Sequence, residues 1–472
     1  MKRLAIILFV GLLVGQKLAA QVAQPYLHHT ERSKDKKDTS TLQAFFRNGE
    51  FYGHARYYFM ATDNAGDLKD FYANAFGMGI GYETGQFKGF QIGISGFFIY
   101  NLASSDFTKT DASTGIGSRY EIGQFDMTNP KNKRDMDRLE DLYLKYSFKA
   151  SHVKLGKQHI RSPFLNPQDG RMRPTLIEGA LLELNEIKHL KLEAAYIFGI
   201  SPRSTVNYYG IGESMSIFPA GIGLDGKKSQ YPSNVNSSAI YLASATIELP
   251  FKAKLQVLNQ HVDQVLNSSF AQLNGQFGLN QNKSIFYGAQ YIQQHAVGNG
   301  GNVNPNLSYV KSGNLARTFG FRLGLEEKKN WQIFANYNRI TKDGRYLMPR
   351  EWGRDPFFTF MARERNEGFA DVHAMNLVSN KVWAKQGLKI EVAYGHYYLP
   401  DIMNVAHNKY AMPSYFQGNV DVRYNFKGFL NGLEGQFLYV YKGNLGNTYE
   451  NNRNIINKVN MSLYNLVLNY HF

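Results

Sequence analysis

Two arginine-rich stretches of this sequence contain the residues best suited to bind a charged ligand. The first, residues 162–175, contains two prolines and then Arg171 and Arg173. The second, residues 342–369, interleaves arginines with acidic and aromatic residues; its arginines are Arg345, Arg350, Arg354, Arg363 and Arg365. A planar guanidinium binds carboxylate or phosphate through two parallel hydrogen bonds. The two stretches could therefore recognise an anionic solute, provided that the fold brings them together.

The segments around these stretches have the two-residue period of β-strands. In residues 461–472, apolar and aromatic side chains alternate with polar ones, and the chain ends on Phe472. The same alternation recurs from Phe51 onward, for example Phe319, Phe321 and Leu323 against Gly320, Arg322 and Gly324. One strand of this kind fits either a soluble sandwich or the wall of an outer-membrane barrel.

The connections between strands favour the barrel. Tight turns are expected near 85–88, 149–151, 186–188, 249–251, 280–283, 327–330, 384–386 and 428–430. They alternate with longer loops near 62–71, 102–138, 162–175, 200–236, 263–268, 295–314, 342–369, 400–414 and 443–456. Short turns on one side and long loops on the other are typical of bacterial outer-membrane barrels, and a closed sheet leaves no backbone group unpaired in lipid. The sequence therefore predicts an all-β fold, a transmembrane antiparallel β-barrel of about 18 strands over residues 51–472 with an aqueous lumen.

Composition narrows the class of protein further. The absence of cysteine excludes disulfides, thiolate metal sites and a lipidated N-terminal cysteine, and a mean hydropathy of −0.38 is too polar for a helical membrane protein. The net charge is +15, of which Lys2, Arg3 and Lys17 contribute three. The basic residues are dispersed along strands and gathered in the two arginine-rich stretches, which argues against nucleic acid as a partner. No motif for a nucleotide, haem or metal is present, so no cofactor is expected.

The N-terminus has the pattern of an exported protein. Residues 1–20 combine a basic start, an apolar core and Leu18-Ala19-Ala20, which predicts a signal peptide cleaved after Ala20. Residues 21–50 are polar and charged, and we expect a mobile periplasmic lead-in. The adjacent His28 and His29 lack further ligands and are not interpreted as a metal site.

The second arginine-rich stretch also contains a cluster of aromatic residues: Trp352, Phe357, Phe358 and Phe360. A loop left in water has little use for such side chains, so we expect this one to pack inward on the lumen. The alternatives are a self-packed extracellular cap for residues 342–369 and an ordinary rigid external loop for residues 162–175.

Passages within both stretches resemble the OprD-type substrate-specific outer membrane porins. They read QDGRMRP at 168–174, followed by Glu178-Gly179, and PREWGRDPFF at 349–358, ending in RERNEG at 363–368. The strand rhythm extends the resemblance over residues 51–472, although loops 102–138 and 200–236 carry no matching motif. Members of that family are 18-stranded monomeric channels whose third and seventh extracellular loops fold inward to form the narrowest point.

Residues 162–175 and 342–369 are the third and seventh longer connections of this chain. The resemblance implies that Arg171 and Arg173 line the constriction, with further candidates in Arg350, Arg354, Arg363 and Arg365. The resemblance also implies a ladder of basic side chains along the wall, which no motif identifies here. Alternation places these candidates for it on the lumen face: His54, Arg56, Lys145, Lys154, Lys191, Arg322, Lys389 and Arg423. Acids share that face, namely Asp141, Glu193, Glu391 and Asp421, which weakens the expected preference for anions.

Together these features predict an outer membrane porin of a Gram-negative bacterium. It would give passive, partly selective diffusion of small hydrophilic solutes, biased toward anionic or zwitterionic carboxylate-bearing molecules such as amino acids, small organic acids and peptides. We expect a monomer in contact with outer-membrane lipid and lipopolysaccharide. One alternative is a structural or adhesive barrel with a lumen sealed by loops. Another is a barrel hydrolase, for which the sequence offers acids at 135–141 but no Gly-x-Ser-x-Gly elbow.

Overall fold

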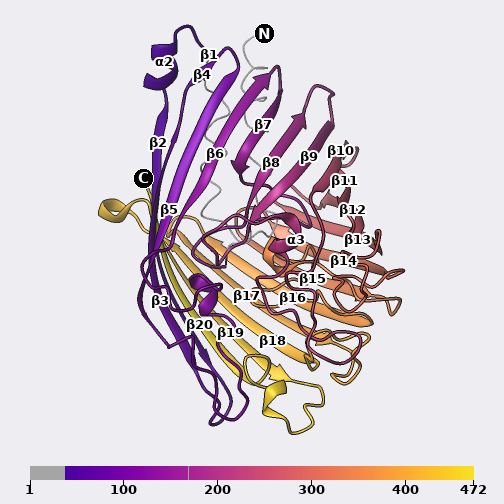
Figure 1. Ribbon diagram of the computed structural model, residues 1–472. Coiled ribbons are helices and arrows are strands. Elements are labelled where there is room, and N and C mark those ends of the chain that lie inside the picture. The colour runs from indigo at the N-terminus through magenta and orange to yellow at the C-terminus, as the bar shows by residue number, and fades with distance from the viewer. Residues whose placement is uncertain (1–37, 168–169) are drawn as a thin grey trace. The chain divides into compact units, whose positions relative to one another are not determined.

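The computed structural model describes residues 38–167 and 170–472 (Figure 1). The predicted signal peptide, its cleavage site, most of the polar lead-in and the two residues at 168–169 lie outside the described residues. The described chain is dominated by one antiparallel sheet, as the sequence predicts.

Eighteen strands of the described chain form the wall of a barrel. In order they are β2 (Glu50–Asp63), β3 (Phe71–Glu83), β5 (Phe90–Ser104), β6 (Asp137–Phe148), β7 (Ser151–Gln158), β8 (Leu176–Leu184), β9 (Leu190–Ser201), β10 (Ile240–Leu249), β11 (Ala253–Val262), β12 (Leu266–Gly278), β13 (Lys283–Ala296), β14 (Leu315–Glu327), β15 (Trp331–Ile340), β16 (Val372–Trp383), β17 (Leu388–Tyr398), β18 (Tyr415–Asn425), β19 (Leu433–Asn444) and β20 (Met461–His471). Each strand pairs antiparallel with its neighbours in sequence. This arrangement confirms the predicted fold class.

The ring closes between the first and last wall strands. β2 pairs with β20 in the register His54↔His471 to Asp63↔Ser462. Beyond the paired region, Gly53 N–H donates to the Phe472 carbonyl at 2.9 Å and Phe472 N–H donates to the Gly53 carbonyl at 3.0 Å. Because every wall strand then has two neighbours, no sheet edge is left to be satisfied in lipid.

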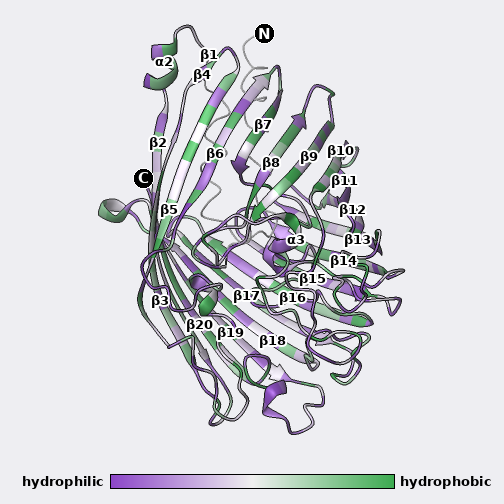
Figure 2. Cartoon of the chain, in the orientation of Figure 1, coloured by the Kyte–Doolittle hydropathy of each residue, from purple (hydrophilic) through white to green (hydrophobic). Residues whose placement is uncertain are grey.

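Exposure alternates along the strands with a period of two. On the outer face of β14, Phe321 is 54% exposed and Leu323 is 63% exposed, whereas the inward Arg56 of β2 is only 1% exposed. Figure 2 shows the same alternation of hydrophobic and hydrophilic residues along the strands. The outer face is therefore apolar and the inner face polar, as expected for a barrel that holds water.

Short turns and long connections alternate around the barrel, as predicted. We call the eight short turns together the short-turn rim: residues 84–89, 149–150, 185–189, 250–252, 279–282, 328–330, 384–387 and 426–432. The nine other connections are loops L1 (64–70), L2 (105–136), L3 (159–175), L4 (202–239), L5 (263–265), L6 (297–314), L7 (341–371), L8 (399–414) and L9 (445–460). One expectation is wrong: the longer loop expected at 263–268 is three residues long, because β12 already begins at Leu266.

The described end of the lead-in is folded onto the short-turn rim. Helix α2 (Leu42–Arg47) begins at Thr41, whose hydroxyl accepts from the Ala44 N–H at 3.1 Å. Phe45 is buried with its ring 6.3 Å from that of Phe87. The two-residue strands β1 (Asp38–Thr39) and β4 (Gln86–Phe87) pair in parallel beside it. Tertiary contacts thus order a short stretch whose polar composition predicts mobility.

Loops fill part of the barrel interior. The largest hydrophobic core cluster joins buried residues of L3 to L9 to inward side chains of β8 to β18. Short helices lie within the loops: η3 (Ile122–Gln124) in L2, α3 (Ile211–Ser214) in L4, η4 (Arg350–Trp352) in L7 and η6 (Asn452–Asn454) in L9. In the short-turn rim, η5 (Gly428–Leu430) lies between β18 and β19. None of the helices in the described ranges is both long and apolar enough to cross a bilayer.

Candidate functional site: the meeting point of loops L3 and L7

Loop L7 runs through the interior of the barrel along its wall. Inward side chains of successive strands donate hydrogen bonds to its carbonyls: Gln290 to Pro356 at 2.9 Å, Arg322 to Phe358 at 3.4 Å, Asn376 to Thr359 at 2.9 Å, Gln417 to Ala362 at 2.8 Å and Lys442 to Arg363 at 2.7 Å. These donors lie on β13, β14, β16, β18 and β19. A buried carbonyl needs such a partner, so the polar wall supports the loop along its length. The loop therefore folds inward, and the alternative of a self-packed outer cap is wrong.

The aromatic residues of L7 fix its position from the other side. Trp352 is 1% exposed and its indole N–H donates to the Ser214 hydroxyl of α3 at 2.9 Å. The rings of Tyr346 and Phe357 lie 4.9 Å apart within the same core. Trp352, Phe357 and Phe358 are thus buried and Phe360 is half-buried, as expected of a loop that packs inward. Trp352 joins L7 to L4.

Loop L3 meets L7 inside the barrel. The Asn166 side chain donates to the Arg354 carbonyl at 3.1 Å and accepts from the Arg354 N–H at 3.1 Å. Arg363 donates to the Gly170 carbonyl at 3.0 Å, and to Tyr58 and Asn465 of the wall at 2.5 and 2.7 Å. Arg363 is therefore a direct link between the two loops and the closing strands β2 and β20.

The guanidinium groups of Arg171 and Arg363 come together where the loops meet. Arg171 donates to the same Gly170 carbonyl as Arg363, at 2.5 Å. Burial lowers the pKa of Arg171 to about 9, and the positive charge of Arg363 adds to this effect. Burial also lowers the pKa of Arg203, in L4, and the charges of Arg365, Arg171 and Arg363 contribute. A pKa near 9 leaves Arg171 charged at neutral pH, so this point of the interior is electropositive.

The other predicted arginines point elsewhere. Arg173 is 1% exposed, donates to the Met136 carbonyl and lies 5.8 Å from the Phe97 ring. Arg354 lies 5.4 Å from the Phe360 ring. Arg350 turns away from L3, forms an ion pair with Glu367 and lies 3.6 Å from the ring of Tyr410. Of the six predicted site arginines, only Arg171 and Arg363 share an acceptor. Arg365 pairs with Asp355 at 3.8 Å and donates to the Gly353 carbonyl at 2.5 Å, both within L7. The other three serve the packing of the loops.

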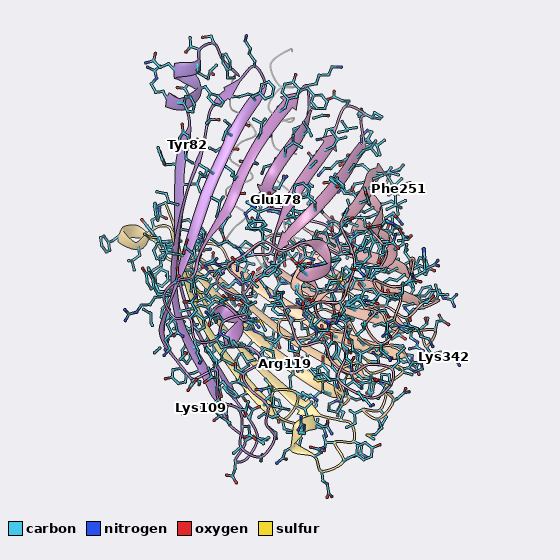
Figure 3. The ribbon with its side chains drawn as sticks, viewed as in Figure 1. Tyr82, Lys109, Arg119, Glu178, Phe251 and Lys342 are labelled. Atoms are coloured by element: carbon cyan, nitrogen blue, oxygen red, sulfur yellow. The ribbon has the colours of Figure 1, made fainter. Side chains whose placement is uncertain are left out.

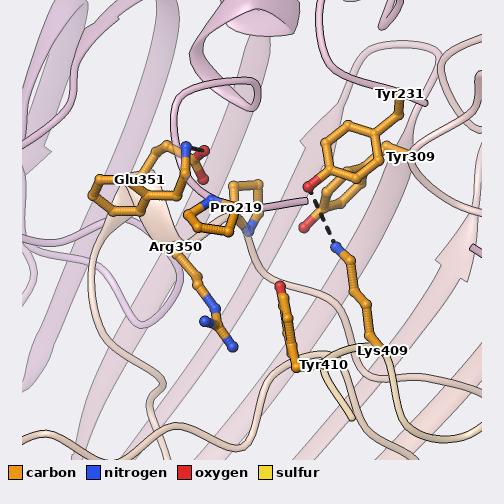
Figure 4. A pocket seen from close by; sticks show the side chains of 9 residues that line it. Pro219, Tyr231, Tyr309, Arg350, Glu351, Lys409 and Tyr410 are labelled. Carbon is orange, nitrogen blue, oxygen red and sulfur yellow. Dashed lines mark hydrogen bonds between the residues drawn. The ribbon is translucent and has the colours of Figure 1, made fainter. Parts of the chain in front are cut away.

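The base of L7 is fixed by neighbouring loops (Figure 4). Tyr410 of L8 donates to Glu367 at 2.8 Å. Lys409 is 3% exposed and lies 4.8 and 4.9 Å from the rings of Tyr231 in L4 and Tyr309 in L6. Although burial opposes ionisation, the charges of Arg350 and Lys409 hold the pKa of Glu367 below its ordinary value. This buried, charged cluster therefore connects L4, L6, L7 and L8 at the base of L7.

Acids within L7 balance its arginines. The loop contains six basic and six acidic residues. Burial raises the pKa values of Glu351, Asp355 and Glu364 above those of ordinary carboxyls. The formal net charge of L7 is zero when every acid is ionised, and the raised pKa values shift that balance toward positive. Arg171 of L3 and Arg203 of L4 add further positive charge beside it.

The eight residues of the predicted ladder all lie on the inward face of the wall, but in different settings. Two touch the site or its surroundings: Arg56 donates to the Arg171 carbonyl at 2.6 Å, and His54 stacks on Phe97 at 4.7 Å. Three are paired with acids, through Lys191–Glu193 at 2.8 Å, Lys389–Glu391 at 3.3 Å and Arg423–Asp421 at 3.1 Å. The rest lie among polar or aromatic wall residues: Arg322 bonded to Asn336 at 2.7 Å, Lys154 at 3.4 Å from the Tyr143 ring, and Lys145 opposite Lys154 in register.

Sequence reasoning missed two buried cations beside the site. Arg138 donates to the Pro174 carbonyl at 2.8 Å and pairs with Glu140 at 3.1 Å. Strict alternation along β6 would point both side chains outward, but a register shift between Ser95 and Gly96 inserts one extra residue and turns them inward. Arg203 lies in L4, which carries no recognisable motif, and only the fold brings it to the Arg350 carbonyl at 2.6 Å.

No cluster of three or more metal-ligating side chains occurs in the ranges 38–167 and 170–472. A search of curated proteins found no match to this chain. Solved structures do match it. Pseudomonas aeruginosa OccK9 (OpdG) is 15% identical with a TM-score of 0.71, and Acinetobacter baumannii OccAB2 is 14% identical with a TM-score of 0.70. Pseudomonas aeruginosa OpdK, solved with vanillate, is 14% identical with a TM-score of 0.68. Each comparison covers 91% of this chain and 99% of the other.

At such low identity these structures support the fold alone. The model of the OprD family of outer membrane porins, by contrast, matches residues 43–350, which is more than half of the chain. The family and the fold are those of a channel rather than an enzyme. The chain belongs to the OprD family of outer membrane porins.

Proposed function

We propose that this porin passes small carboxylate-bearing solutes, anionic or zwitterionic, through a constriction formed by L3 and L7. The single observation that carries the proposal is the convergence of Arg171 and Arg363 on one acceptor, the Gly170 carbonyl. A solute carboxylate is a stronger, charged acceptor for the same guanidinium groups. The carboxylate of a passing solute can therefore replace the Gly170 carbonyl as the acceptor for a short time and then dissociate.

The balance of charge argues for weak rather than tight selection. Lys191, Lys389 and Arg423 are already paired with acids along the wall. A channel must bind its solute loosely enough to release it, which a site surrounded by compensating charges allows. The vanillate found with OpdK is also a carboxylate, which is consistent with this class of solute. Passage is then passive diffusion, with the local positive potential raising the anion concentration at the constriction.

A liposome-swelling panel tests the proposal. Vesicles containing the purified protein should swell faster in amino acids and dicarboxylates than in neutral sugars of similar size. Arg171→Gln should reduce that difference without abolishing swelling. Equal rates for all solutes, in the wild type and the variant, would contradict the carboxylate preference. An absence of swelling and of conductance would instead favour the alternative of a structural or adhesive barrel sealed by its loops.

Other parts of the assignment are proposed on the same basis. We propose that the protein works as a monomer in contact with lipopolysaccharide and that residues 1–20 are removed after Ala20. Mass spectrometry of the protein purified from membranes would give the mature N-terminus, and native mass spectrometry its oligomeric state. A mature chain that begins elsewhere, or a stable oligomer, would contradict these two points.

A further inference from the structure

The short-turn rim carries a ring of lysines. Every one of its turns contains a lysine or directly precedes one: Lys88, Lys149, Lys188, Lys252, Lys283, Lys328, Lys329, Lys385 and Lys427. All nine are exposed. Because successive hairpins of an antiparallel barrel place all such turns at one end, these lysines encircle a single rim.

The short-turn rim carries many lysines and almost no acidic residues. Its eight turns contain eight lysines, counting those within the turn boundaries, and one acidic residue, Glu186. The nine loops at the other end contain 22 basic and 19 acidic residues over much longer stretches. The excess of positive charge is therefore greatest, relative to length, in the short turns of the rim.

Within the described chain, none of the nine rim lysines forms an ion pair with a carboxylate. Lys328 and Lys427 donate only to the carbonyls of Gln281 and Lys385. Nearby acids at the strand ends have other partners: Glu248 pairs with Lys254 at 3.1 Å, and Glu327 accepts from the Trp331 indole at 2.8 Å. Lys88 lies 5.5 Å from the Phe87 ring, but no carboxylate of the described residues neutralises the rim lysines.

Exposed apolar side chains accompany these lysines. Phe251 is 81% exposed beside Lys252, Phe429 is fully exposed two residues from Lys427, and Ile187 is 60% exposed beside Lys188. Trp331 and Trp383 lie at the ends of β15 and β16 next to the turns of Lys328, Lys329 and Lys385. They share the outward face with Ile333 and Leu377, which are 39% and 52% exposed. Aromatic rings at the level of the headgroups with lysines reaching past them are typical of a membrane–water interface.

We propose that the short-turn rim binds the headgroup phosphates of anionic phospholipids in the adjoining membrane leaflet. Charge complementarity supplies the attraction: a lysine near an anionic membrane surface strengthens the association by roughly five-fold. The apolar neighbours keep the lysines at headgroup depth. The ring of lysines would fix the depth of the barrel in the membrane and enrich anionic lipid around the rim. Neither effect depends on which solute passes through the lumen.

The native tryptophans allow a direct test with the full chain. Trp331 and Trp383 lie at the rim, whereas Trp352 is buried in L7 and contributes a constant background. The protein is reconstituted in phosphatidylcholine vesicles containing either brominated phosphatidylglycerol or brominated phosphatidylcholine, and quenching of tryptophan fluorescence is measured. We expect phosphatidylglycerol to be preferred by roughly three- to ten-fold at low salt, and the preference to shrink in 0.5 M NaCl, where the Debye length is about 4 Å.

Matched variants complete the test. The triple change Lys328→Gln, Lys329→Gln and Lys385→Gln should bring the preference to about one, and the same three changes to arginine should retain it. The control is Lys109→Gln, Lys311→Gln and Lys342→Gln, which removes three exposed lysines from the long loops; Lys109 and Lys342 are labelled in Figure 3 together with Phe251 and Tyr82 of the opposite end. Unchanged single-channel conductance shows that each variant is folded.

Two results would overturn the proposal. One is equal quenching by the two brominated lipids in the wild type, which would point to an acidic macromolecule as the partner of the rim. The other is a glutamine triple variant that keeps the wild-type preference. Neither result depends on which solute the channel carries, so this test and that of the proposed function fail independently.

Discussion

Replacing Arg363 by glutamine should change both the selectivity and the size of the pathway. The guanidinium donates to Gly170 of L3 at 3.0 Å and to Tyr58 and Asn465 of the wall at 2.5 and 2.7 Å. A glutamine amide is shorter, has no charge and cannot reach all three acceptors. The substitution therefore removes a positive charge from the site and the direct link between Arg363 and L3.

The magnitude follows from Coulomb's law. An anion that passes about 5 Å from a unit positive charge gains about 0.8 kcal/mol even at the dielectric constant of water, which is about four-fold in local concentration. Cations lose a similar amount beside the same charge, so removing it should lower the anion-to-cation permeability ratio by about sixteen-fold, the product of the two effects. Each lost hydrogen bond from a charged donor is worth about 1.5–3 kcal/mol, so L7 should also move more freely and conductance should rise.

Planar-bilayer recordings in a KCl gradient measure both effects, since the reversal potential gives the permeability ratio and the current gives the conductance. Lys342→Gln is the matched control, because it removes the same charge from an exposed position of the same loop. If Arg363→Gln kept the wild-type reversal potential and conductance, this guanidinium would lie outside the conducting path. The assignment of the L3–L7 contact as the constriction would then fail.

Three further predictions concern the loops that hold the site. Glu367→Gln leaves the buried Arg350 without its carboxylate and should lower the stability of the loop packing by about 3–5 kcal/mol. Trypsin should then cleave L7 at Arg350. Resistance to trypsin equal to that of the wild type would show that the Arg350–Glu367 ion pair does not hold L7 in place. Glu121 is a buried carboxyl of L2 whose charge is coupled to that of Arg171. Burial raises its pKa, so it takes up its proton at a higher pH than an exposed glutamate, and acidification should increase anion preference. Glu121→Gln should show that increased preference at neutral pH, whereas a flat pH profile in the wild type would refute the coupling. Trp352→Ala removes a buried indole at a cost of about 3–5 kcal/mol and should increase open-channel noise, with the heat-induced gel shift of the barrel unchanged; quiet recordings would show that the ring does not hold L7.

The barrel could be predicted from the sequence because its physical cause is local. A strand between lipid and water must alternate side chains with a period of two, so Phe319 and Leu323 alone indicate which face of β14 is outside. Turn length is equally local, and the alternation of connections identifies L3 and L7 as the third and seventh at the end opposite the short-turn rim, although L5 is only three residues long. The alternation also places His54, Arg56 and Lys191 on the inward face without any knowledge of their partners.

The site was decided by contacts between segments far apart in the chain. Arg171 and Arg173 are two residues apart in the same loop, yet only Arg171 meets Arg363. The guanidinium groups of Arg171 and Arg363 donate to the same acceptor, the Gly170 carbonyl. A one-residue bulge in β6 turns Arg138 inward, and the period-two rule cannot anticipate such an insertion. Outside the bulged end of β6, sequence alone determined which strand residues face the lumen and which face lipid, since that depends on the pleat of each strand. Only the tertiary structure decided which arginines converge and which are neutralised, since that depends on how loops close over distances that no local pattern encodes.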